Sequence, residues 1–206
     1  SIAALSAPED KRSIVGDLLQ RGDLAILVTP IDSAAPKGRL ILPQQQTIRD
    51  VLDSGAGAVV VKETELSHML SCLAQTPRIV ITDSQAFAPV AAIVPEDIPL
   101  TSFSILFARH KGDLIQAVRG AAALETVQDG DTILISEGCT HHRQCDDIGS
   151  VKLPRWIRGH TGKELRFVFS SGTEFPEDLS PYRLIVHCGG CMLNPRQMRS
   201  RQKCAA

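Results

Sequence analysis

Short apolar strand segments alternate with helical segments in the first half of the chain, and this alternation restricts the fold more than any other feature. Strands are predicted at residues 24–28, 58–61 and 78–81, with helices between them at 44–53 and 65–74. Because the first run is continuously apolar, both of its faces must be covered. Helices on the two faces of a parallel sheet meet this requirement. The first half is therefore predicted to form a mostly parallel sheet flanked by helices.

Two further segments of the first half are predicted outside this sheet. A helix is expected to open at residues 8–10, to carry Ile14 and Leu18 on its apolar face, and to end at Gly22. Glycine is a favoured residue directly after a helix. Residues 31–43 are rich in proline, which excludes a regular helix. We expect a long loop there, for binding or for contact within a dimer.

The second half repeats this kind of organisation. Its predicted elements are a helical stretch at 102–123 interrupted near Gly112, a strand at 132–136, a helix at 148–157 restarted at Pro154, and strands at 165–169 and 184–186. Pro89, Pro95 and Pro99 separate the halves and indicate a domain boundary. We therefore expect an α/β chain of two small domains, residues 10–98 and 99–206. Each domain is predicted to hold a mostly parallel sheet flanked by helices.

The charge balance excludes several classes of partner. The 206 residues include 22 lysines and arginines and 23 aspartates and glutamates, so the chain has no strong positive field to attract nucleic acid or anionic lipid. No apolar run approaches the roughly 20 residues that cross a bilayer. Residues 1–10 lack the layout of a secretory signal. The sequence predicts a cytoplasmic protein with no nucleic-acid or membrane partner.

The six cysteines are clustered in a way that favours metal binding over a disulfide framework. Cys139 and His141 follow one predicted strand, and the run His187, Cys188 and Cys191 follows another. If these strands are parallel neighbours, their carboxyl ends bring the cysteines to one edge of the sheet. The sequence therefore predicts a metal site at this edge.

The residues around the second cysteine pair favour the same site. Gly189 and Gly190 have no side chains to keep backbone N–H groups away from sulfur. Asn194 is predicted to cap a helix that has Pro195 at its first position. The positive end of that helix would point towards a negatively charged metal site.

Spacing alone leaves two kinds of metal centre open. Three cysteines and a histidine form a good tetrahedral zinc site. The same cysteines can equally hold an iron-sulfur cluster. Buried structural cysteines with core histidines are a weaker alternative, because a Cys-x-x-Cys turn flanked by histidine is rarely only a packing feature.

The arrangement of Cys139, His141, His187, Cys188 and Cys191 resembles that of the HydF family, the maturation GTPases of iron-iron hydrogenases. The resemblance extends over nearly the whole chain. It is carried by the segments 16–19, 28–32, 35–43, 46–50, 82–85, 99–106, 146–149 and 154–156.

This resemblance implies a 4Fe-4S cluster held by Cys139, Cys188 and Cys191. The fourth iron site would be exchangeable, with His141 and His187 nearby. It also implies a homodimer that associates through the first domain, residues 10–98, while residues 99–206 hold the cluster. The family acts as a scaffold that receives a diiron precursor from the radical-SAM maturases HydE and HydG and delivers it to the apo-hydrogenase. The alternatives are a redox cluster module and a zinc-stabilised module that mediates protein interaction.

The sequence departs from the full family pattern in two respects. It has no Gly-x-x-x-x-Gly-Lys-Ser/Thr motif, since the nearest candidate, at residues 159–163, has different glycine spacing and is followed by Glu164. We therefore expect that the GTPase domain, with its GTP, is missing, that residues 1–9 are its linker, and that this chain is not an enzyme. The family also continues beyond the last helix, so we expect a truncated cluster domain.

The other candidate residues have plainer interpretations. Cys72 is predicted to pack within a helix, Cys145 to be incidental, and Cys204 to be a surface thiol. His142 would point away from His141 in an extended segment. The segment 82–85 and the pair Asp146 and Asp147 are predicted to cap helices.

Overall fold

The structure is a computed structural model that describes residues 12–31, 40–138, 148–172, 174–188, 190 and 193–206. Its first sheet consists of four parallel strands. The strand order is β2-β1-β3-β4. The strands are β1 (Leu24–Val28), β2 (Gly57–Val61), β3 (Ile79–Thr82) and β4 (Leu100–Ser102). The helices beside them are α1 (Leu42–Asp53), α2 (Leu66–Cys72), α3 (Phe87–Ala91) and α4 (Phe103–Lys111). Among its described residues this half also contains the 3-10 turns η2 (Gly16–Leu18), η3 (Glu63–Glu65) and η4 (Ser84–Ala86).

Strand β1 explains why this sheet is covered on both faces. Alternate strand residues point to opposite faces. Ala25 and Leu27 belong to a core cluster shared with α1 and α4, whereas Ile26 and Val28 belong to a second cluster shared with α2 and α3. All four side chains are fully buried. The continuous apolar run therefore forms a doubly covered central strand, as predicted.

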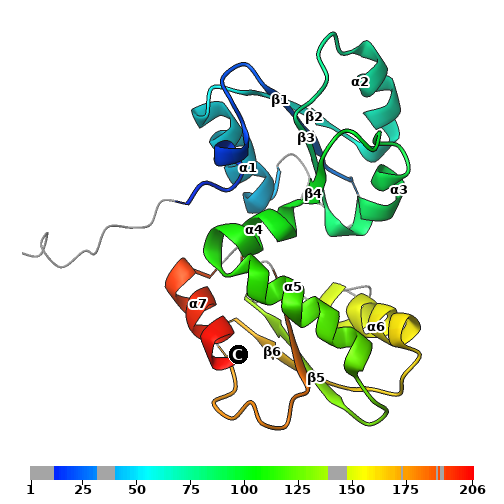
Figure 1. Cartoon of the computed structure of the whole chain (residues 1–206), viewed down its shortest axis with the longest axis vertical. Coiled ribbons are helices and arrows are strands. Elements are labelled where there is room, and N and C mark those ends of the chain that lie inside the picture. The colour runs from blue at the N-terminus through cyan, green and yellow to red at the C-terminus, as the bar shows by residue number, and fades with distance from the viewer. Residues whose placement is uncertain (1–11, 32–39, 139–147, 173, 189, 191–192) are drawn as a thin grey trace, which may run out of the picture.

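A second parallel sheet has the order β6-β5-β7. Its strands are β5 (Thr132–Glu137), β6 (Arg166–Ser171) and β7 (Leu184–His187). The helical elements of this half are α5 (Leu114–Ala122), η5 (Ala123–Thr126), the π-helical turn η6 (Ile148–Lys152), α6 (Leu153–Thr161) and α7 (Pro195–Cys204). Figure 1 shows the two sheets, each flanked by helices, which confirms the predicted α/β fold.

Helix α4 lies between the two sheets (Figure 1) and contacts α1 on one side and α7 on the other. Ser102 caps it by accepting a hydrogen bond from the backbone N–H of Ile105, at 3.2 Å. The predicted interruption near Gly112 separates α4 from α5. Among the described residues, no helix has the length and apolar character that crossing a membrane requires.

Two elements lie in the proline-rich region that we interpreted as the boundary between the halves. Strand β4 follows Pro99 directly, and the carbonyl of Pro99 accepts a hydrogen bond from Val80, at 2.9 Å. Proline is compatible with this edge position because its missing N–H is not needed there. Helix α3 contains Pro89 within its first turn, where proline is also tolerated. The first sheet therefore continues beyond residue 98.

The predicted first helix differs from the structure in its described part. Residues 12–22 contain only the 3-10 turn η2. The carboxylate of Asp50 accepts hydrogen bonds from the backbone N–H groups of Val15 and Gly16, at 2.7 and 2.6 Å, and so replaces helical partners. Leu18 is 42% exposed, whereas Ile14 is buried. The apolar residues reach the core from a turn rather than from a helix face.

Candidate metal centre

Of the five predicted site residues, the structure describes His187 and Cys188. Cys139, His141 and Cys191 lie outside the described residues, as do His142, Cys145, Asp146 and Asp147. The residues directly before Cys139 and Cys191, Gly138 and Gly190, are described. The site can therefore be built from Cys188 and from the chain that leads to the other two cysteines.

The strands that lead to the predicted site are parallel neighbours. Strand β5 pairs with β7, and Ser136 lies opposite His187 in the register. Both strands therefore end at the same edge of the second sheet, where the backbone N–H of Cys188 donates to the carbonyl of Ser136, at 3.1 Å. This confirms the arrangement of strands on which the site prediction depended.

Two backbone N–H groups approach the sulfur of Cys188. Gly138 donates to Sγ at 3.0 Å, and Gly190 donates at 3.4 Å. Hydrogen bonds of this kind stabilise negative charge on sulfur and are typical of metal-bound thiolates. The two donors are the residues that directly precede Cys139 and Cys191.

The two glycines are needed for this close approach. A Cβ on Gly138 would lie 2.8 Å from Cγ of the buried Leu193 and 3.4 Å from Cα of Gly190. Gly190 has a φ of 62°, in the left-handed region that favours glycine. The sequence predicted this role for Gly190 but not for Gly138. The feature that could have indicated Gly138 is its position directly before Cys139.

Both ring nitrogens of His187 have partners. Nδ1 lies 2.8 Å from the carbonyl of Cys188, and Nε2 lies 3.0 Å from Nη1 of Arg201. We assign the proton to Nδ1, because the carbonyl only accepts and the guanidinium only donates. Burial lowers the pKa of His187, and the positive charge of Arg201 lowers it further. The hydrogen bond to the carbonyl of Cys188 has the opposite effect, which is smaller than that of burial. In this conformation His187 is neutral and orients Cys188, with no ring lone pair directed at a metal.

Arg201 is a buried cation beside this histidine. Its guanidinium also donates to the carbonyl of Gly172 at 2.7 Å and to Oγ of Ser136 at 3.4 Å, and it lies over the ring of Phe175. Burial lowers its pKa, and negative charge on Cys188 opposes that shift. Within the described part of the chain, no carboxylate forms an ion pair with Arg201.

Lys111, at the end of α4, is a second buried cation. Its Nζ donates to the carbonyls of Gly190 and Leu193, both at 2.9 Å. Sequence reasoning missed Lys111 and Arg201. Lys111 lies in the last turn of α4 and Arg201 lies in the basic helix α7, both usual places for exposed basic residues. The sequence alone therefore does not indicate that they are buried.

These groups fit a negatively charged, thiolate-bound metal centre. A sulfur that accepts two N–H groups, close glycine packing and two buried cations all favour an anionic group at this edge of the sheet. Among the described residues alone, no three histidines, cysteines or acidic residues form a metal-binding group. The predicted ligand set also includes Cys139 and Cys191, which lie outside the described residues.

Other predicted features differ in their outcome. Asn194 caps α7 by accepting from the N–H of Gln197 at 2.9 Å, with Pro195 in the first turn, as predicted. Cys204 is exposed, which confirms a surface thiol. Cys72 is also exposed, so the expected packing is wrong, because it lies at the free end of a short helix. Asp83 does not cap with its side chain but accepts from Gln44 of α1, at 3.1 Å.

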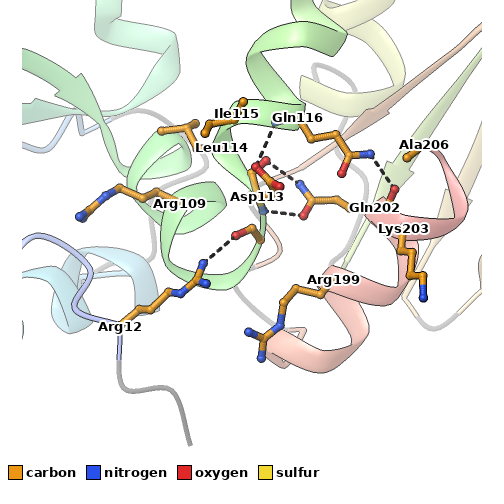
Figure 2. Close-up of a pocket in the computed structure, with 11 residues that line it drawn as sticks. Arg12, Arg109, Asp113, Leu114, Ile115, Gln116, Arg199, Gln202, Lys203 and Ala206 are labelled. Carbon is orange, nitrogen blue, oxygen red and sulfur yellow. Dashed lines mark hydrogen bonds between the residues drawn. The ribbon is translucent and has the colours of Figure 1, made fainter.

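A pocket of about 650 Å³ lies where α4, α5 and α7 meet (Figure 2). Gln202 of α7 accepts a hydrogen bond from the backbone N–H of Asp113 at 2.7 Å, and its own carbonyl accepts from the side chain of Gln116 at 2.7 Å. Arg12 and Arg109 line the opposite side. Gln202 thus connects the last helix to the junction between α4 and α5.

The sequence matches two domains of one family, which meet at this junction. Residues 14–112 match the hydrogen maturase F dimerization domain, and residues 115–206 match the hydrogen maturase F tetramerization domain. No curated protein matches the chain. The two matched segments contain the first sheet with α4 and the second sheet with α5 to α7, respectively.

Proposed function

The chain belongs to the hydrogen maturase F (HydF) family, which acts in hydrogenase maturation, and from this premise we propose that it is a scaffold for metal-cluster assembly. In this proposal Cys139, Cys188 and Cys191 hold a 4Fe-4S cluster. The fourth iron site accepts a diiron precursor as cargo, which the scaffold delivers to the apo-hydrogenase. The radical-SAM maturases HydE and HydG supply the cargo.

The observation that carries this proposal is the environment of the Cys188 sulfur. The N–H groups of Gly138 and Gly190 both donate to it. Since these glycines directly precede Cys139 and Cys191, the chain that leads to each further cysteine already contacts the first. This supports a site in which the three thiolates share one metal group.

The buried cations support an anionic occupant. The negative charge of three thiolates exceeds the positive charge of the iron-sulfide core that they bind. A cluster of this kind is therefore anionic as a whole. Arg201 lies next to His187, and Lys111 donates to the carbonyls of Gly190 and Leu193. Burial of the Arg201 guanidinium carries a desolvation cost, which a nearby anion would offset.

The hydrogen bonds of His187 support an exchangeable fourth iron site. Its Nε2 is engaged by Arg201, so this side chain does not complete a fourth protein ligand in the described conformation. In the proposal an incoming group can then take that position, with His141 nearby. A cluster with three protein thiolates supplies one iron that can take an external ligand, which suits a carrier better than simple electron transfer.

Ligand exchange at the cluster tests the carrier proposal against the redox alternative. The protein is reconstituted with iron and sulfide without oxygen, reduced, and examined by electron paramagnetic resonance with and without cyanide or imidazole. We expect the added ligand to change the spectrum, because one iron is open to it. A cluster spectrum that neither ligand alters would contradict the exchangeable site and favour a redox module.

A further inference from the structure

We propose that Lys111 is a positioning residue that fixes the peptide before Cys191 and places a positive charge beside the cluster. This inference rests on the proposed function, since it concerns the loop that would hold the cluster. It adds a residue from α4, which lies far from the cysteines in sequence.

The first argument is the burial of the lysine. Lys111 is only 8% exposed. Lysine is rarely buried unless its ammonium group has partners, because removing the charge from water is costly. Its Nζ donates to the carbonyls of Gly190 and Leu193, and it also lies 5.3 Å from the centre of the Phe107 ring. The ammonium group is therefore directed at the loop and not at solvent.

The second argument is that Gly190 is held from both sides. Its N–H donates to Sγ of Cys188, while its carbonyl accepts from Lys111. The carbonyl of Gly190 belongs to the peptide that joins it to Cys191. With the φ of 62° that only glycine adopts easily, these two hydrogen bonds fix the direction of the chain as it enters Cys191.

The third argument is the origin of the lysine. Lys111 lies within the segment that matches the dimerization domain, whereas Gly190 and Leu193 lie within the segment that matches the tetramerization domain. Helix α4 also packs on α1 of the first sheet. A shift of α4 would therefore move the ammonium group relative to the cluster loop, and the first domain would influence the cluster through this side chain.

The charge of Lys111 has a measurable consequence for the cluster. A buried positive charge stabilises the more negative, reduced state of a nearby cluster, because electrostatic interactions are weakly screened in the interior. Removal of the charge should lower the reduction potential. Removal of the two hydrogen bonds should also loosen the loop and weaken metal retention.

The test compares Lys111→Met with Lys111→Arg in the whole chain after anaerobic reconstitution. A redox titration followed by electron paramagnetic resonance gives the potential, and chelator challenge gives the rate of iron loss. For Lys111→Met we expect a lower potential and about tenfold faster iron loss. Lys111→Arg keeps the charge, so its potential should stay close to that of the unsubstituted protein. Lys203→Met, which removes an exposed lysine of α7, should change neither quantity.

An unchanged potential in Lys111→Met would overturn the proposal, even if the protein became less stable. If that variant does not fold, as judged by circular dichroism, Lys111→Gln replaces it, since glutamine can still donate to carbonyls but carries no charge. Failure of the proposed function itself looks different, because the unsubstituted protein would then bind no iron and sulfide.

Discussion

The side chain of Cys188 shows how single residues build the candidate site. Its sulfur accepts two backbone N–H groups, its carbonyl accepts from His187, and its own N–H donates to β5. Each of these bonds fixes the position or charge of the sulfur. The Cys-x-x-Cys pattern identified this residue from sequence, but it did not identify Lys111 or Arg201, because their roles depend on burial.

Replacement of Cys188 should therefore remove the metal. We expect Cys188→Ser to lose most of its iron after reconstitution, because two remaining thiolates do not compensate for the third and the two N–H donors would then face a poorer ligand. Iron analysis measures the effect. Cys72→Ser is the matched control, since Cys72 is exposed on α2 and should be dispensable. Full iron content in Cys188→Ser would disprove the ligand assignment.

Replacement of Gly138 should damage the same site without removing a ligand. In Gly138→Ala the new Cβ would lie 2.8 Å from Cγ of Leu193, so the loop must shift. We expect a loss of about 1–3 kcal/mol in the free energy of unfolding, measured by urea denaturation. Gly159→Ala, with nothing within 4 Å of the new Cβ, should instead gain about 0.5–1 kcal/mol within α6. Equal effects of the two substitutions would contradict this account of Gly138.

At the scale of elements, the fold was largely predictable where hydrophobic pattern alone decides it. Strand β1 is uniformly apolar because both of its faces are covered, and the sequence shows this directly. Helix α3 was missed because it contains Pro89. Strand β4 was missed because it follows Pro99 and forms only by pairing with β3. The turn η2 was missed because its hydrogen-bond partner, Asp50, lies on α1.

The ion pair between η2 and α4 gives a prediction for pH. Arg109 donates to both carboxylate oxygens of Asp17 and lowers the pKa of that carboxyl below its ordinary value of 3.8. A lowered pKa in the folded state means that the pair stabilises the protein above pH 3.8 and that this contribution is lost as the pH falls through the folded-state pKa. Asp17 is about half exposed, so the contribution is small.

We expect Asp17→Asn to lower the free energy of unfolding by about 0.2–1 kcal/mol at neutral pH. The difference from the unsubstituted protein should disappear in acid, because the carboxyl is then protonated in both states. Urea denaturation across this pH range measures it. Asp53→Asn is the control, since its pair with Arg49 within α1 is more exposed and should contribute less. A deficit for Asp17→Asn that persists unchanged in acid would show that the charge is not responsible.

At the scale of the whole molecule, helix α5 presents an apolar surface that the described part of the chain leaves exposed. None of its residues is buried, and Ile115 and Val118 are 67% and 62% exposed. These two side chains are three residues apart and share one face of the helix. The domain that contains them matches a tetramerization domain, and exposed apolar surface of this kind is typical of association sites. A second copy of the chain is the occupant that this match favours.

The double substitution Ile115→Glu and Val118→Glu should therefore reduce the size of the assembly. Charged side chains on this face would have to be buried without partners when two copies associate. Analytical ultracentrifugation of the whole chain measures the result. Val151→Glu is the control, because Val151 is an exposed apolar residue of η6 in the same domain but not on α5. An assembly of unchanged size in the double variant would exclude this face as the contact.

The central claim, that the second sheet edge holds an iron-sulfur cluster, is tested most directly by metal analysis. Iron, acid-labile sulfide and zinc are determined together on protein purified or reconstituted without oxygen. The account predicts about four iron and four sulfide per chain and no stoichiometric zinc. One zinc per chain with no sulfide would contradict it, and the sulfur of Cys188 would then belong to a structural zinc site.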